Sequence, residues 1–164
     1  MKELLLQYAE YNVWANKLTT DALLQLDENL ADKEVVSSFS SIRATTYHTI
    51  GAEYIWLQRL QLVEHPIWLP DSFEGTFAAA CNAWNNYSNE LVKFASRQYD
   101  DRALEHVCAY NDRKGSPHKT PVYQILQHIF NHSTYHRGQL ITMLRQVGAT
   151  KIPGTDFIAF VKQG

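Results

Sequence analysis

Three of the seven histidines in this sequence, His128, His132 and His136, lie within nine residues. Their spacing of four places them along one side of a helix. At about 100° per residue, the apolar stripe of this helix consists of Ile125, Ile129, Leu140, Met143 and Val147. His136 falls near the centre of the stripe, His132 inside it towards one edge, and His128 near its border. Two core-facing imidazoles one turn apart need an explanation, because burying an unpaired imidazole costs free energy.

A divalent transition metal would satisfy both imidazoles, since zinc, nickel, copper and iron all accept imidazole nitrogen. An i, i+4 pair presents two donors to one ion, as in the helix motif of metalloproteases. That motif's glutamate is absent here, because Ser133 follows His132. A third ligand must come from another helix, and the best candidate is His48, on the same side as Ala52 and Ile55. Three histidines leave coordination positions open, which is typical of catalytic sites.

The alternative is that these histidines are core residues satisfied by polar partners, in a helical protein that only mediates interactions. His128 is either a border or surface histidine or a group that orients a ligand or a bound water. Arg137 is either solvated or ion-paired, or it binds an anionic substrate. Tyr8, Tyr11 and Trp14 either belong to the core or line the end of the bundle near the metal.

Four long amphipathic segments predict helices that position these residues. Their expected limits are Lys2 to Leu26, Ser38 or Ser40 to Val63, Ser72 to Arg97, and Pro121, with Thr120 as N-cap, to Gly148. The apolar face of the first comprises Leu4, Tyr8, Tyr11, Ala15, Leu18 and Ala22. Two stretches, Leu104 to Tyr110 and Lys114 to Lys119, predict a short β-hairpin before the last helix. The economical fold is an all-α four-helix bundle in one domain over residues 1–164, with a tail that packs on it.

The composition excludes several classes of function. The chain has 164 residues, 45% hydrophobic and 20% charged, with a net charge of -2 and a pI near 6.4. This small negative net charge does not predict binding to nucleic acid. No stretch is long and apolar enough to span a membrane. The N-terminus lacks the features of a signal peptide. Cys81 and Cys108 do not make a disulfide framework and are too far from basic residues to predict nucleophiles, so we expect a reduced, cytoplasmic protein.

Three segments resemble the DinB (DNA-damage-inducible) family, also called DinB/YfiT-like. His128-Ile-Phe-Asn-His132-Ser-Thr-Tyr-His136-Arg-Gly-Gln resembles the signature of its closing helix. Tyr11-Asn-Val-Trp-Ala-Asn16 resembles its first-helix motif. Ser41-Ile-Arg-Ala-Thr-Thr-Tyr-His48, followed by Trp56-Leu-Gln-Arg-Leu60, resembles its second-helix segment. The resemblance covers essentially the whole chain, with the segments in the right order.

The resemblance implies a four-helix bundle with up-down-down-up connections, often a homodimer, and a metal site formed by His48, His132 and His136. The family's metal is usually zinc or nickel, and related transferases and isomerases use low-molecular-weight thiols. We therefore expect a metal-dependent transferase or hydrolase acting on a small molecule, with a thiol as substrate or cosubstrate. The alternative is a non-catalytic metal- or ligand-binding module of a stress response. The sequence shows neither a fourth protein ligand nor a general base.

Overall fold

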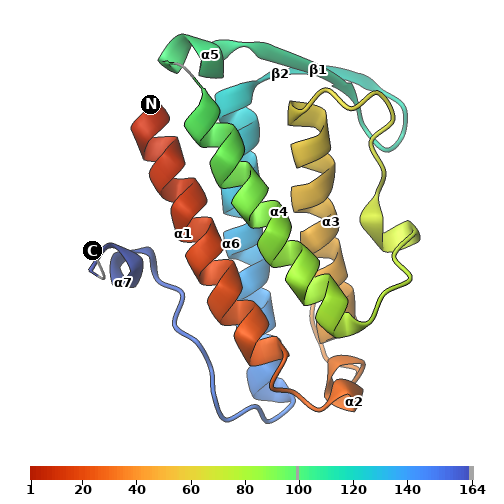
Figure 1. Cartoon of the computed structure of the whole chain (residues 1–164). Helices are drawn as coiled ribbons and strands as arrows, with labels where there is room; N and C mark the ends of the chain where they lie inside the picture. Colours follow the sequence, from red (N-terminus) through yellow and green to blue (C-terminus); the bar gives the residue numbers. More distant parts are fainter. Residues whose placement is uncertain (99, 163–164) are drawn as a thin grey trace.

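Four long helices form the bundle in this computed structural model, which describes residues 1–98 and 100–162. They are α1 (Lys2–Leu23), α3 (Ile42–Leu60), α4 (Phe77–Arg97) and α6 (Val122–Gln146). Figure 1 shows that α1 and α6 run in one direction and that α3 and α4 run in the other. α1 packs against α4 and α6, and α3 packs against the same two helices. The predicted up-down-down-up bundle is therefore confirmed.

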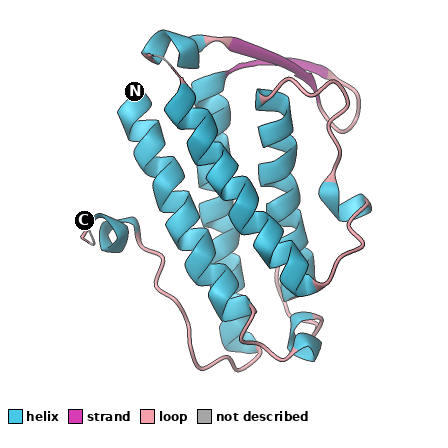
Figure 2. Ribbon diagram, in the orientation of Figure 1, coloured by secondary structure: helices cyan, strands magenta, loops and turns pink. Residues whose placement is uncertain are grey.

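Short elements connect these helices (Figure 2). They are α2 (Glu28–Ala31), the 3-10 turn η1 (Leu69–Asp71), α5 (Asp101–Glu105), strands β1 (Val107–Asn111) and β2 (Pro117–Pro121), and α7 (Phe157–Val161). None of the helices in the described residues has the length and apolar character needed to cross a bilayer. The expected domain and its tail include positions 99, 163 and 164, which lie outside the described residues.

The predicted β-hairpin is confirmed, although both strands begin later than expected. Strands β1 and β2 pair antiparallel, with Val107 opposite Pro121 and Asn111 opposite Pro117. The first strand does not begin at Leu104, because Asp100 caps the short helix α5 over that position. Residues 112–116 form the turn, in which Gly115 has a φ of +85° that suits glycine. The hairpin therefore projects residues 112–116 beyond the end of the sheet.

Two predicted helix starts are wrong, because other residues supply the caps. The Ser41 hydroxyl accepts the Ala44 N–H at 3.1 Å, so α3 begins after Ser41 rather than at Ser38 or Ser40. The Thr76 hydroxyl likewise accepts from the N–H of residue 79 at 3.1 Å, so α4 begins after the expected Ser72. Residues 69–71 form η1, which packs on α3, and residues 72–76 that follow it have no helical structure.

The last long helix begins one residue later than predicted and ends as predicted. Thr120 pairs with Cys108 in the sheet, so it is not free to cap α6, and Pro121 takes the N-cap position. At the other end Gly148 has a φ of +90°. The Gly148 N–H donates to the carbonyl oxygen of Arg145 at 3.1 Å. The Ala149 N–H donates to that of Leu144 at 3.0 Å, and the two bonds together form a Schellman motif.

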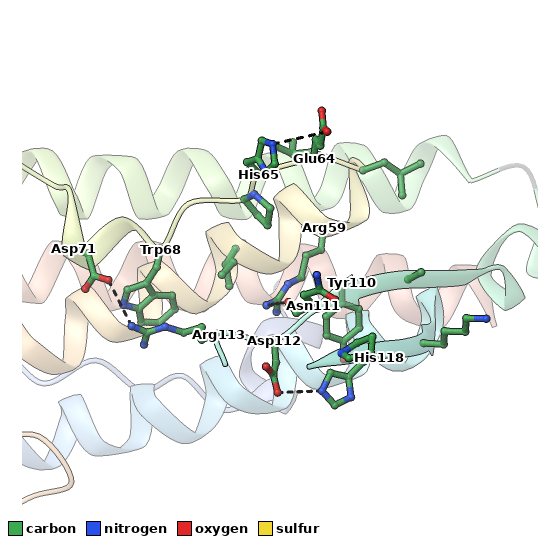
Figure 3. Close-up of a pocket in the computed structure, with 17 residues that line it drawn as sticks. Arg59, Glu64, His65, Trp68, Asp71, Tyr110, Asn111, Asp112, Arg113 and His118 are labelled. Atoms are coloured by element: carbon green, nitrogen blue, oxygen red, sulfur yellow. Dashed lines mark hydrogen bonds and ion pairs between the residues drawn. The ribbon is translucent and has the colours of Figure 1, made fainter. Parts of the chain in front are cut away.

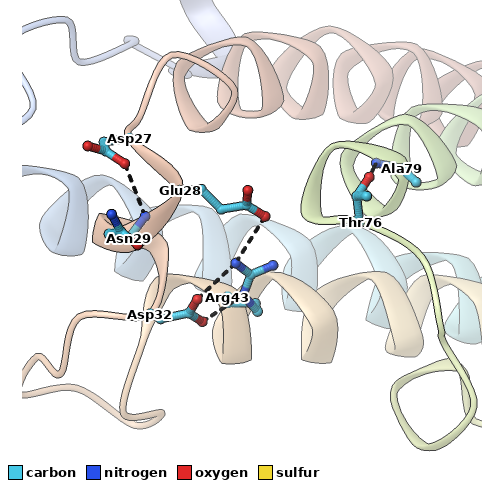
Figure 4. Close-up of polar contacts among 7 residues, drawn as sticks. All are labelled: Asp27, Glu28, Asn29, Asp32, Arg43, Thr76 and Ala79. Atoms are coloured by element: carbon cyan, nitrogen blue, oxygen red, sulfur yellow. Dashed lines mark hydrogen bonds and ion pairs between the residues drawn. The ribbon is translucent and has the colours of Figure 1, made fainter.

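An arginine on α3 fixes the connection between α1 and α3 (Figure 4). The Arg43 guanidinium donates to both carboxylate oxygens of Asp32, at 2.6 and 2.9 Å, and lies 3.5 Å from a Glu28 oxygen. This hydrogen bond lowers the pKa of Asp32. Because Asp32 follows α2 directly, the contact holds the start of the 33–41 segment against α3. This segment carries Phe39, whose ring packs against that of His48.

A polar layer divides the apolar core into two clusters. One cluster lies near the hairpin and includes Leu57, Leu91, Leu126 and Ile129, and the other includes Ile50, Trp84, Leu140 and Met143. Between them, the Glu53 carboxylate of α3 accepts hydrogen bonds from all three other long helices. Its donors are Asn12 (3.0 Å) and Asn16 (2.8 Å) of α1, Ser88 (2.9 Å) of α4 and Ser133 (2.7 Å) of α6. Glu53 is 1% exposed, so these bonds replace its hydration.

The same layer explains why the predicted apolar face of α1 is wrong in part. Leu4 is 57% exposed, whereas the polar side chains of Asn12 and Asn16 are buried. A helix face assigned from apolar residues alone therefore points in a different direction from the face that is actually buried. The exposed edge of α1 is covered instead by α7, since the Tyr8 and Tyr11 rings lie 5.0 and 5.1 Å from the ring of residue 157. Trp14 likewise contacts Phe160 of α7. The predicted packing of the tail on the bundle is therefore confirmed. Because these three aromatic residues contact α7, they do not line the histidine cluster.

Replacing Glu53 by alanine should lower the free energy of unfolding by about 3–5 kcal/mol, because it leaves several buried donors without their acceptor. Urea denaturation followed by circular dichroism measures the change. The matched control is Glu90→Ala, which removes a surface partner of Lys93 and should stay within about 0.5 kcal/mol of wild type. Equal stabilities of the two variants would contradict a central role for Glu53.

Candidate metal centre

Helices α3 and α6 bring the three predicted ligands together. The Nε2 atoms of His48 and His132 lie 3.2 Å apart, and those of His132 and His136 lie 3.1 Å apart. One ligand atom from each histidine lies within 4.8 Å of the others. Zinc–nitrogen bonds of about 2.0–2.1 Å in a tetrahedral site separate two nitrogens by about 3.3 Å. The spacing of these donors therefore fits a single transition-metal ion.

A glutamine one turn further along α6 orients the ring of His136. The Nδ1 atom of His136 lies 2.7 Å from Gln139 Oε1, which as a carbonyl oxygen can only accept. The proton is therefore on Nδ1, and Nε2 presents a lone pair to the other two imidazoles. The Gln139 amide in turn donates to Ser38 Oγ at 2.8 Å and to Tyr135 Oη at 3.1 Å. Sequence reasoning missed Gln139, although its i+3 spacing from His136 was visible.

Aromatic rings surround the cluster on its outer side. The Phe39 ring lies 4.5 Å from that of His48, and Trp68 lies 5.7 Å from it. The Tyr135 ring lies 5.0 Å from that of His136. Phe39 belongs to the 33–41 segment that Arg43 helps to hold, so a stretch that looked like a plain connection forms one wall of the site.

Burial leaves the imidazoles neutral at pH 7. It lowers the pKa of His48 to about 4 and that of His132 to about 3, and repulsion from neighbouring imidazolium charges adds to the effect. Burial also lowers the pKa of His136, against a smaller opposing effect of Gln139. Neutral imidazole is the form that binds metal, so protons compete weakly for this site at neutral pH.

The polar layer fixes the direction in which α6 presents its histidines. Each clustered histidine of α6 is followed at once by a residue of this layer, Ser133 after His132 and Arg137 after His136. Adjacent residues on a helix point about 100° apart, so anchoring one sets the direction of the other. Ser133 donates to Glu53, and Arg137 Nη1 donates to the amide oxygens of residues 12 and 16 at 2.6 and 2.7 Å.

Arg137 is only 1% exposed and its partners are neutral oxygens. The expectation that it is solvated or ion-paired is therefore wrong, and its burial gives a soluble anion no access to it. The two cysteines behave as expected for core residues, since burial raises the pKa of Cys81 to about 12 and also raises that of Cys108. Neither is a candidate nucleophile.

His128 lies beside the three-histidine cluster without joining it. Its ring is 5.6 Å from that of His132 and 5.3 Å from that of Trp56, and the residue is exposed. Within the described residues its imidazole makes no hydrogen bond to His132. The border position is confirmed, whereas a role in orienting a ligand stays a prediction.

The fold and the cluster together define a class: a helical bundle with a two-stranded hairpin before its last long helix and three histidines shared by α3 and α6. The model of the DinB family matches residues 1–163. The chain therefore belongs to the DinB family, as the resemblance of its motifs predicted.

One curated relative and two solved structures support this assignment. The chain is 28% identical to protein DinB of Bacillus subtilis strain 168, over 96% of this chain and 93% of that protein. A crystal structure of a DinB-like protein from Bacillus cereus ATCC 10987 superposes with a TM-score of 0.67 at 18% identity, covering 90% of this chain and 94% of the other. The DinB-like protein YjoA of Bacillus subtilis gives the same TM-score at 14% identity, covering 92% and 98%. At these identities the two structures show the shared fold.

Proposed function

We propose that this DinB family protein binds one divalent transition metal, zinc or nickel, through the Nε2 atoms of His48, His132 and His136. The observation that carries the proposal is the convergence of three neutral imidazoles at distances that suit one ion. Three nitrogen donors suit zinc and nickel, and they leave at least one coordination position for another molecule.

We further propose that the protein is an enzyme that uses this position for transfer or hydrolysis on a small molecule, with a low-molecular-weight thiol as substrate or cosubstrate. When bound, the metal would lower the pKa of a water or thiol in the open position. The chain's own part is to hold the imidazoles in place through Gln139 and the polar layer, and to limit water through the ring of Phe39. In the described residues, the hydrogen-bond and ring contacts of the three imidazoles include no carboxylate, so the proposal assigns no general base.

Protein purified without an affinity tag should contain about one zinc or nickel per chain, measured by elemental analysis. The variant His132→Ala should lose most of this metal, because it removes the ligand that faces both other imidazoles. The control is His65→Ala, which changes an exposed histidine and should keep the wild-type content. Wild-type protein that contains no metal and takes up neither added zinc nor nickel would refute the metal site.

Metal-loaded protein should accelerate the reaction of a thiol with an electrophile such as monochlorobimane. The assay compares bacillithiol, mycothiol and glutathione, and the rate should fall by at least about tenfold in His132→Ala. The rate of metal-stripped wild type provides the second comparison. A loaded protein that turns over none of the three thiols would refute the thiol-dependent reaction and favour the alternative, a non-catalytic metal- or ligand-binding module.

The homodimer, the cytoplasmic location and the lack of nucleic-acid and membrane partners stay predictions from the sequence.

A further inference from the structure

A cleft of about 1040 Å³ lies between the C-terminal half of α3, the loop that follows it and the β-hairpin (Figure 3). Sites for small molecules in proteins measure roughly 300–1,000 Å³, so the cleft is large enough for one. Its walls include the aromatic side chains of Trp68 and Tyr110 and the guanidinium of Arg59. None of the three clustered histidines lines this cleft, so it is distinct from the candidate metal site.

The loop side of the cleft is fixed by specific contacts with α3. The buried Gln58 side chain donates to the backbone oxygen of Ile67 and accepts from its N–H, both at 3.0 Å. Pro70 packs so closely on Gly51 that a Cβ at that glycine would lie 2.6 Å from a proline carbon. The position of Trp68 between these two contacts is therefore well defined.

Arg59 carries a nearly buried charge that forms no direct ion pair with a described residue, although the Asp112 carboxylate lies near enough to attract it. It is 8% exposed, and its guanidinium lies over the rings of Trp56 and Tyr110, at 4.5 and 4.7 Å. Its Nη2 donates to the Asn111 carbonyl at 2.9 Å, whereas Nε is buried with no partner in the described residues. None of the ion pairs among those residues includes Arg59. Such a charge is costly unless something compensates it.

Most of the other ionisable groups of the cleft lie in pairs, as the dashed lines of Figure 3 show, and the histidines among them are charged only when protonated. The pairs are Arg113 with Asp71 (3.5 Å), His118 with Asp112 (3.1 Å) and His65 with Glu64 (3.8 Å). Lys119 also lines the cleft, but it is exposed and its charge is hydrated. Among the described residues, Arg59 is thus a buried cation of the cleft with no carboxylate in direct contact, and a ligand could supply that contact.

We infer that this cleft binds a small organic oxyanion, a carboxylate or a phosphate ester, with Arg59 as the anchor for the charge. Trp68 and Tyr110 provide ring surface for the rest of the ligand, beside the contacts that Arg113 makes with the Trp68 ring (4.5 Å) and His118 with the Tyr110 ring (5.6 Å). Oxyanions suit this site because a guanidinium forms charge-assisted hydrogen bonds with them.

The cleft also adjoins the histidine cluster. Trp68 contacts both, since its ring lies 5.7 Å from that of His48. The two residues His48 and Arg59 stand on the same helix, 11 positions or about 16 Å apart along its axis. A ligand anchored at Arg59 would extend towards the proposed metal. This extension towards the metal rests on the proposed function, whereas anion binding in the cleft does not.

The test is a ¹⁹F NMR titration with 4-fluorobenzoate, 4-fluorophenyl phosphate and the neutral 4-fluorobenzamide. At least one anion should bind at least about tenfold more tightly than the amide, because only an anion gains the charge-assisted bonds. Which anion binds more tightly identifies the oxyanion. In Arg59→Gln this preference should vanish, whereas the control Arg145→Gln, an exposed arginine of α6, should retain it.

Equal binding of the amide and the anions to wild type would overturn the inference, as would an unchanged preference in a folded Arg59→Gln. No binding of either anion at millimolar concentration would also overturn it. If Arg59→Gln does not fold, Trp68→Phe provides the second variant. It should weaken anion binding without removing the preference over the amide. Unchanged anion binding in Trp68→Phe would overturn the assignment of this cleft as the site. Metal-free His132→Ala should bind the anion as wild type does, so the outcome is independent of the metal proposal.

Discussion

The carboxylate of Glu53 joins all four long helices through hydrogen bonds, and the arrangement of the site depends on it. It accepts hydrogen bonds from α1, α4 and α6 while belonging to α3. Apolar clusters on either side would tolerate small rotations of a helix, because hydrophobic contact is not directional. Hydrogen bonds are directional, so the polar layer fixes the rotation of α6 and thereby points His132 and His136 towards His48. A buried polar network of this kind costs stability unless every member is satisfied, and it defines one packing in return.

Much of the fold and the three histidines could be predicted from the sequence because they leave periodic signals. The stripe of α6 placed His136 at the core and His128 at the border, and the structure confirms both positions. What failed depends on contacts between segments distant in the chain. The burial of Asn12 and Asn16 follows from Glu53, 41 and 37 residues away, and no local pattern marks it. Glu53 itself looked like an ordinary helix residue.

The surroundings of the three histidines were less predictable than the histidines themselves for the same reason. Phe39 and Trp68 lie in segments without regular structure, and each reaches the histidines because other contacts fix its segment. Arg59 shows the same limit, since the lack of a direct ion pair with any described residue is a property of the folded cleft. The rigid bundle supplies the histidines, whereas the connections supply the walls that a substrate would meet.

The most direct test of the proposed metal centre is X-ray absorption at the metal edge of protein loaded with one equivalent of zinc. The structure predicts three imidazole nitrogens at about 2.0–2.1 Å, with the remaining position taken by a light atom from solvent. Loss of one imidazole from the spectrum in His48→Ala would place the site between α3 and α6. Protein sulfur at about 2.3 Å, or fewer than three imidazoles in wild type, would contradict the convergence of His48, His132 and His136 on one ion.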